Sequence, residues 1–430
     1  MNRQQLSDEL PYEFVEPKPG AFWIWLARLY ARRAYLPGPM RVAEVEITGL
    51  EVLKALTSAN EGILIAPNHP DHADPSVMLD VSRRAGVAFS FMAAYQVCQG
   101  NGRIARWMFP RIGVFPVDRE GSDLKAFKTG VEILAAGKTP LVVFPEGEVY
   151  HVCDRLTPIR EGAAVLATSA AKRSADRGKN VWIVPAAIKY RFLDGHDPSP
   201  AMDAAMGRLE RRFTWWPRPD HSLIERIYAF AEAMLGLKEM EYFGATRPGP
   251  IKGRLVALRD AILDALEDRH FRKRRSDPAP VRVKEIRHAC LEKLADPAIT
   301  PESARDLRRD LNDAFVAIQI FSYPGDYLRD VPTVERIAET LMKFEQDVIG
   351  DEPAPMAPRR AIVRFGPPID VRAALAAHAK PRLAAATITT DLESRIQSLL
   401  DSIGPGRPVD VPQLAAPPIA SRFRVGGSSS

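Results

Sequence analysis

Cysteine is scarce in this sequence. Only Cys98, Cys153 and Cys290 occur in 430 residues, and they lie far apart. Three cysteines at such spacing exclude a disulfide framework of the small secreted type, and they exclude a zinc module built on paired cysteines. We therefore expect the protein to work in a reducing compartment.

Long apolar runs are also missing. The first 14 residues, MNRQQLSDELPYEF, hold no apolar core of a signal peptide. The longest uncharged run, residues 85–102, is interrupted by Gln96, Gln99 and Asn101, whereas a bilayer-spanning helix needs about 20 predominantly apolar residues. We expect a cytoplasmic protein with no signal peptide and no transmembrane helix.

No strong excess of one charge is present. The 59 Lys and Arg residues face 54 Asp and Glu residues, which gives a net charge of only +5. Nucleic-acid-binding proteins usually carry a denser basic stripe, so we expect no nucleic-acid partner. The apolar fraction of 46% and the charged fraction of 26% are ordinary for a globular protein, and they exclude a disordered or fibrous chain.

Residues 42–194 alternate between short β-branched or aromatic runs and helical stretches. The runs lie at 45–48, 63–66, 87–92, 112–117, 141–144 and 181–184. Helices are predicted between several of them, one over residues 75–84 and another opening at Thr157-Pro158. Such alternation is typical of the α/β class, in which helices flank a sheet.

Helical patterns dominate from residue 195 to 357, where apolar residues recur at spacings of three and four. Residues 361–371 again predict a strand that ends in a turn. Residues 402–430 hold many prolines and close with GGSSS, so we expect a disordered tail there.

Residues 1–41 include a distinctive segment at 21–41, which holds five aromatic residues, four arginines and no acid. Aromatic side chains favour a membrane interface and arginines favour anionic headgroups, so one interpretation is an interfacial helix region that binds a membrane surface. The other is a helix packed on the domain with its arginines in solvent.

The sharpest motif is NHPDHADP at residues 68–75, where a strand runs into a turn. His69 and Asp74 fit a general base and the carboxylate that orients it. Other interpretations remain open. Asp74-Pro75 suits the start of the next helix, His69 suits a hydrogen-bonded turn, and His69, His72 and Asp74 suit metal ligands, although we expect no metal.

Three further motifs end predicted strands. Arg119 closes GVFPVDR at 113–119 and can bind a phosphate or carboxylate. Glu146 and Gly147 belong to FPEG at 144–147, which puts a carboxylate beside a backbone that a ligand can approach. Pro185, in VPAAIK at 184–189, indicates an edge or bulge position in its strand.

These four blocks, in this order, resemble the glycerolipid acyltransferase superfamily, which includes lysophosphatidic acid and glycerol-3-phosphate acyltransferases. The resemblance covers roughly residues 40–192. It implies that His69 is the base, that Asp74 is its partner, and that Arg119, Glu146 and Gly147 line the acceptor site. It also implies a last strand near Gly366 to Ile369, so that residues 195–357 would be a helical insertion or second domain and residues 358–401 a return to the α/β domain.

The family transfers a fatty acyl group from acyl-CoA or acyl-carrier protein to a hydroxyl, with no metal and no bound cofactor. The resemblance thus implies an acyl thioester donor, a lysophospholipid or glycerol phosphate acceptor, and a peripheral place on the membrane. The family usually continues FPEG with Thr-Arg, but this chain has Glu148-Val149. We therefore keep two alternatives, a non-phosphate acceptor and a non-catalytic lipid-binding protein with this fold. We predict weaker selectivity for phosphate-bearing acceptors.

Overall fold

The computed structural model describes residues 12–100, 102–119, 123–175, 178–215, 221–350 and 352–409. Its centre is a mixed sheet of eight strands, in the order β1-β7-β6-β2-β5-β3-β4, with β8 paired to β6. The strands are β1 (Val42–Thr48), β2 (Gly62–Pro67), β3 (Ser90–Ala94), β4 (Val114–Val117), β5 (Leu141–Val142), β6 (Val181–Phe192), β7 (Arg359–Phe365) and β8 (Ile369–Asp370). The α/β class predicted from the alternating pattern is confirmed.

Helices cover both faces of this sheet because side chains of a strand alternate between its two faces. Leu64 and Ala66 of β2 face one apolar core, and Ile63 and Ile65 face the other. The first core includes helices α7 (Leu124–Ala136), α8 (Gly162–Ser174), α16 (Val371–Ala376) and α17 (Pro381–Ile403). The second includes η1 (Ala31–Tyr35), α3 (Leu50–Ser58) and α4 (Asp74–Ala85).

Helix α2 (Ala21–Tyr30) belongs to the N-terminal segment, and three short elements connect β3 to β4. They are α5 (Tyr95–Gly100), α6 (Gly102–Met108) and η2 (Phe109–Ile112). Within the described ranges, none of the helices is both long and apolar enough to cross a bilayer.

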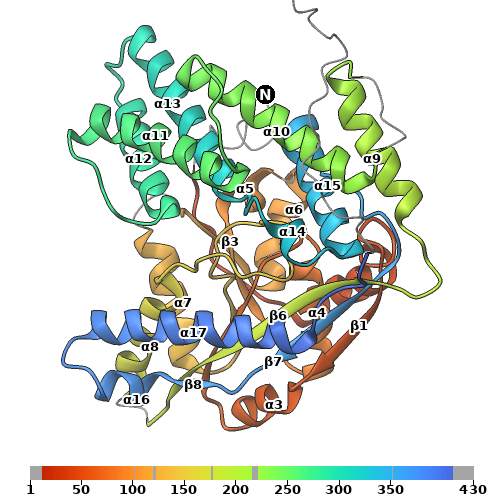
Figure 1. The fold of residues 1–430 in the computed structure, drawn as a ribbon. Helices are drawn as coiled ribbons and strands as arrows, with labels where there is room; N and C mark the ends of the chain where they lie inside the picture. The colour runs from red at the N-terminus through yellow and green to blue at the C-terminus, as the bar shows by residue number, and fades with distance from the viewer. Residues whose placement is uncertain are drawn as a thin grey trace, which may run out of the picture.

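The helical region gathers above one end of the sheet (Figure 1). Its helices are α9 (Ser199–Arg212), α10 (Leu223–Phe243), α11 (Ile251–Phe271), α12 (Ala279–Leu294), α13 (Pro301–Phe321), α14 (Tyr327–Asp330) and α15 (Val334–Ile349). They form two apolar cores, one around α9, α10 and α15 and one around α11, α12 and α13.

The chain returns to the sheet after α15. Strand β7 runs antiparallel to β6, with Tyr190 opposite Ala361, and parallel to β1. The segment predicted to be the last strand therefore lies inside the sheet, between β1 and β6. Whether residues 195–357 are an insertion or a separate domain stays an interpretation.

Three local predictions differ from the structure. Pro185 lies in an interior strand and not at an edge, although the pairing beside it is irregular, in line with the alternative of a bulge position. The carbonyl of Pro185 accepts a hydrogen bond from the amide of Gly366. The N–H and the C=O of a strand residue point to the same side, so the N–H that proline lacks would face the irregular passage from β7 to β8. Proline is tolerated there for this reason. No helix opens at Thr157, and α8 begins only at Gly162, because the amides of Thr157 and Ile159 bond to the side chains of Glu146 and Glu393 instead.

The third difference concerns the tail predicted from residue 402. Helix α17 extends to Ile403, and Val409 donates its amide to Pro332 beside the helical region. The boundary at 402 is therefore too early, because pairing with the segment before α15 holds this proline-rich stretch. Residues 410–430 of the predicted tail, and residues 1–11 of the predicted interfacial region, lie outside the described residues.

Candidate active site

The sequence motifs meet at one edge of the sheet. Strands β2, β4 and β5 belong to the parallel part of the sheet, and their carboxyl ends lead to His69, Arg119 and Glu146. Ligands of α/β sheets usually bind at this edge. Asn68 fixes the first loop, because its amide both donates to and accepts from the backbone of Ile188 on β6, at 3.0 and 2.6 Å.

His69 and Asp74 form a hydrogen-bonded pair. His69 Nδ1 lies 2.8 Å from Asp74 Oδ2, and the Asp74 side chain is fully buried while that of His69 keeps 16% of its surface exposed. A carboxylate on Nδ1 fixes the tautomer that leaves Nε2 able to accept a proton. The predicted juxtaposition is therefore present in the structure.

Asp74 serves the loop before it rather than the helix after it. It is the first residue of α4 and is not the N-cap of that helix. Its carboxylate accepts from the amide of Asp71 at 2.9 Å and from the hydroxyl of Tyr190 at 2.5 Å. Burial raises the pKa of Asp74, while the hydrogen bonds from His69 and Tyr190 favour the charged form.

Glu146 braces the same loop from β5. Its two carboxylate oxygens accept from the amides of His69 and Thr157, at 2.7 and 3.1 Å. Burial raises the pKa of this carboxyl to about 7. Phe144, two residues before it, stacks on the His69 ring with centroids 4.0 Å apart. Glu146 thus holds His69 in place instead of offering both oxygens to a ligand.

Arg119 pairs with Glu148, a residue at which this chain departs from the family motif. Its guanidinium lies 2.8 Å from a carboxylate oxygen of Glu148 and also donates to the carbonyl of Gly147. Burial raises the pKa of Glu148, but the charges of Arg119 and Arg160 outweigh it and leave the pKa lowered. The acid at 148 therefore neutralises the cation that the motif places at the acceptor site.

Gly147 is required by backbone conformation and by space. Its φ of +81° lies in the left-handed region that glycine occupies without strain. A Cβ at this position would stand 2.9 Å from Nε of Arg160. The glycine of FPEG thus lets the chain turn tightly between the Glu146 and Glu148 side chains.

Sequence reasoning missed an ion pair under the site. Asp71 and Arg359 are both buried and pair through two hydrogen bonds of 2.6 and 2.8 Å. Burial raises the pKa of Asp71, but Arg359 more than offsets this and sets it to about 2. Arg359 also lies over the ring of Tyr190 at 4.2 Å. No sequence signal links positions 288 residues apart, although Asp71 itself lies inside the motif.

The alternative metal site at His69, His72 and Asp74 receives no support from the geometry. Asp74 is bonded to His69, whereas the ring of His72 packs against that of His151, with centroids 5.5 Å apart. Among the described residues, this set is not one in which three ligand atoms converge.

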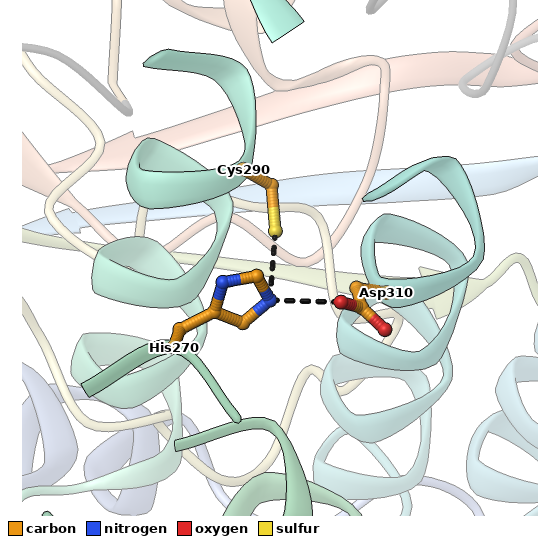
Figure 2. A group of neighbouring side chains, drawn as sticks. All are labelled: His270, Cys290 and Asp310. Atoms are coloured by element: carbon orange, nitrogen blue, oxygen red, sulfur yellow. Dashed lines mark hydrogen bonds and ion pairs between the residues drawn. The ribbon is translucent and has the colours of Figure 1, made fainter. Parts of the chain in front are cut away.

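One such convergence exists elsewhere in the described part of the chain. His270, Cys290 and Asp310 come from α11, α12 and α13, with ligand atoms within 4.8 Å of one another (Figure 2). Lys293 Nζ can only donate, so His270 Nδ1 accepts from it at 3.1 Å, and Nε2 then carries the proton given to Asp310 at 2.8 Å. Arg269 pairs with the same carboxylate. These cations and protons favour a hydrogen-bonded network over a metal site.

Cys290 fits the same network. It is fully buried, and burial raises the pKa of its thiol to about 11. A neutral thiol is neither a good metal ligand nor a good nucleophile. The three side chains therefore join α11, α12 and α13 through polar contacts.

Two comparisons with known proteins bear on the site. Residues 44–189 match the family model described as Acyltransferase, and this range contains His69, Asp74, Arg119 and Glu146. A 1-acyl-sn-glycerol-3-phosphate acyltransferase of Streptococcus pneumoniae (strain ATCC BAA-255 / R6) is 31% identical over 111 residues. That alignment covers 26% of this chain and 38% of the relative, so the chain matches less than half the length of that protein.

Proposed function

We propose that residues 44–189, which match the Acyltransferase family model, form a domain of the glycerolipid acyltransferase superfamily, and that the protein moves a fatty acyl group from an acyl thioester to a hydroxyl of a glycerolipid. The donor is acyl-CoA or acyl-carrier protein. The acceptor is a lysophospholipid, a glycerol phosphate or a related alcohol. The observation that carries the proposal is the pair of His69 and Asp74, 2.8 Å apart at the carboxyl end of β2.

The mechanism follows from the tautomer that Asp74 imposes. His69 Nε2 takes the proton of the acceptor hydroxyl as the oxygen attacks the thioester carbonyl carbon. Asp74 stabilises the imidazolium that forms. The tetrahedral intermediate then expels the thiolate, which takes the proton back from His69. Acyl transfer of this kind needs no metal and no bound cofactor, because the activated acyl group arrives with the substrate.

The remaining residues position the base. Glu146 accepts from the backbone amide of His69, and the side chain of Asn68 bonds to the backbone of β6, so both hold the chain at the start of the loop. Phe144 covers one face of the imidazole. Such packing limits the ring to one orientation, and well-positioned catalytic groups owe much of their effect to orientation.

A non-phosphate acceptor is a second candidate, favoured by one observation. Glu148 pairs with Arg119, so the guanidinium that would meet a phosphate already has a carboxylate partner. A phosphate dianion near this pair would meet the negative charge of Glu148 as well as the positive charges of Arg119 and Arg160. A monoacylglycerol or another uncharged alcohol would meet no such conflict.

Attachment to a membrane surface is part of the proposal, because a lysophospholipid acceptor and the acylated product reside there. An aromatic patch, defined as Phe22, Trp23, Trp25 and Trp107, joins α2 to α6 through the contact of Trp23 with Trp107 at 4.9 Å. Phe22, Trp25 and Trp107 are 60%, 57% and 46% exposed. Arg111 lies over the Trp107 ring at 4.0 Å. Exposed aromatic rings beside cations suit the headgroup region of a bilayer.

The test is an acyl-transfer assay on the full chain. Labelled palmitoyl-CoA and palmitoyl-acyl-carrier protein are each offered with glycerol 3-phosphate, lysophosphatidic acid, lysophosphatidylcholine and monoacylglycerol. We expect a labelled product with the wild type and a loss of about 10²- to 10⁴-fold in His69→Ala. Asp74→Asn should lose most of the activity too.

The matched control is His196→Ala, which removes an exposed histidine outside the site and should act like the wild type. Circular dichroism of each variant separates loss of fold from loss of chemistry. A folded His69→Ala protein that still transfers acyl groups at the wild-type rate would refute the mechanism. A wild type that binds acyl-CoA but acylates none of the acceptors would favour the non-catalytic alternative.

A further inference from the structure

The helical region contains a cavity of about 230 Å³. Its walls come from α10, α11, α13 and α15, which Figure 1 shows together above the sheet. Ile227, Met234, Leu255, Ile320 and Phe344 are among the side chains that line it. These residues lie outside the range that matches the acyltransferase family model, so the family match gives the cavity no role.

The charged groups in the cavity wall have partners, some within the wall and some beside it. Asp347 accepts from Tyr323 at 2.5 Å and from Gln319 at 3.2 Å, and its carboxylate pairs with Lys343 at 3.2 Å. Lys238 pairs with Glu241 at 2.7 Å. A wall with satisfied charges and an apolar surface suits a hydrocarbon better than a polar ligand.

One residue of the cavity wall, His151, contacts the loop that carries the candidate base. His151 and Val152 form part of the cavity wall, and they follow Glu148 on the chain segment that leaves the active site. His151 packs against His72, which lies between His69 and Asp74 in sequence. Burial lowers the pKa of His151 to about 3, so this part of the wall is uncharged at neutral pH.

We propose that this cavity holds the distal part of the fatty acyl chain of the thioester donor. The inference rests on the proposed function, because it assigns a place to a substrate of that reaction. A cavity of about 150 Å³ lined by apolar side chains accommodates benzene, and on that scale about 230 Å³ accommodates roughly nine carbons. We assign the chain in the cavity to the donor, because the donor carries an acyl chain whichever acceptor is used. A glycerol phosphate acceptor carries no acyl chain.

The first experiment places the chain directly. Wild-type protein is irradiated with palmitoyl-CoA that carries a diazirine at the end of the chain, and the labelled peptides are mapped by mass spectrometry. We expect label on α10 and α15, displaced by excess palmitoyl-CoA. A lysophosphatidylcholine with the same diazirine forms the second arm. Label there from the lysophospholipid alone would overturn the assignment to the donor.

The second experiment narrows the cavity. Ala231→Phe places a ring in the wall of α10, and Leu237→Phe adds the same group on an exposed position of that helix. Burying one methylene strengthens binding about fourfold, so loss of two or more should lower kcat/KM for palmitoyl-CoA relative to octanoyl-CoA by at least tenfold in Ala231→Phe. Leu237→Phe should keep the wild-type ratio.

The outcomes separate this inference from the proposed function. Acyl transfer without label in the helical region, and with an unchanged chain-length ratio in Ala231→Phe, overturns the cavity assignment and leaves the function standing. Label on α10 and α15 from a protein that transfers no acyl group supports the cavity and refutes the function. If Ala231→Phe fails to fold, the labelling of the wild type decides the question by itself.

Discussion

Glu148 neutralises Arg119, the cation that the motif resemblance assigns to an acceptor phosphate. The two side chains are 22% and 29% exposed, so the pair lies partly in solvent and its strength is moderate. Its effect on a ligand is nevertheless large, because a charge-assisted contact to phosphate contributes about 1.5–3 kcal/mol. Substitution at position 148 should therefore change acceptor preference more than it changes stability.

We predict that Glu148→Gln raises selectivity for phosphate. Loss of the acid removes the counter-charge beside Arg119, so the rate with lysophosphatidic acid relative to monoacylglycerol should rise roughly ten- to a hundred-fold. Adding Arg119→Ala should abolish the gain. Initial rates with both acceptors, measured on the wild type and these variants, check it. A wild type that already prefers lysophosphatidic acid strongly, and keeps that preference in Arg119→Ala, would contradict both the weak selectivity and the role of Arg119.

The motif residues were predictable at this scale and their supporting contacts were not. His69 and Asp74 lie five positions apart in one turn, so their contact depends on local chain geometry alone. Tyr190 reaches Asp74 from β6, and Thr157 reaches Glu146 from a loop that was expected to be helix. Such contacts follow from strand register and loop path, which periodicity does not encode.

At the scale of elements, helix α2 packs on the domain, as one of the two interpretations of the N-terminal segment predicted, whereas binding to a membrane stays a prediction. Ile24 of α2 is buried, and Arg28 bonds to Ser82 and to the carbonyl of Val87, so one side of the helix packs on the domain. Phe22 and Trp25 remain exposed on the same helix. The content of aromatic residues and arginines does not show which arginines pack, because that depends on α4 and the loop that follows it.

We predict that the aromatic patch contributes to membrane binding. Phe22→Ser combined with Trp25→Ser should weaken binding to vesicles of phosphatidylglycerol and phosphatidylcholine by tenfold or more, because each ring buries apolar area worth about 1.5–3 kcal/mol. Leu383→Ser, which removes a 54% exposed apolar side chain of α17, should leave binding unchanged. Vesicle sedimentation measures both.

Point substitutions are the better test because deletion of the segment would also damage the core. Leu36 and Met40 belong to the apolar core under β1 and α4, so removal of residues 1–40 confounds binding with folding. High salt should weaken the part of the binding that depends on exposed charge. Equal vesicle binding by the wild type and the double variant would place the membrane contact on another surface.

At the scale of the whole molecule, the fold depends on the return of the chain to the sheet after the helical region. Sequence patterns predict this return only in part. The alternating runs predicted most strands of the sheet, and the run at 361–371 predicted a further one. Its place between β1 and β6 was not predictable, because strand order reflects packing of the entire chain. One consequence is that the active-site loop is held by a residue from beyond the helical region, since Arg359 begins β7.

Arg359 joins three distant segments below the candidate base. It pairs with Asp71, donates to the carbonyl of Met40 at 3.1 Å and lies over Tyr190. Removal of one partner from a buried ion pair typically costs 3–5 kcal/mol, because the other charge is left without compensation. Arg360, its neighbour on β7, instead pairs with the exposed Glu44, and such surface pairs contribute about 1 kcal/mol or less.

We therefore predict that Arg359→Leu lowers the free energy of unfolding by about 3–5 kcal/mol at pH 7, whereas Arg360→Leu lowers it by about 1 kcal/mol or less. Adding Asp71→Asn to Arg359→Leu should restore part of the loss, because it removes the buried charge.

The pKa of Asp71 is about 2 in the folded protein, so the stability from its ionised form is present above its ordinary pKa near 4 and is lost as pH falls toward 2. The gap between wild type and Arg359→Leu should accordingly narrow on acidification from about pH 5 to about pH 3. Urea unfolding followed by tryptophan fluorescence measures the free energy of unfolding of each variant at each pH. A difference between wild type and Arg359→Leu that stays constant over this pH range would show that Arg359 acts by packing and not through its charge.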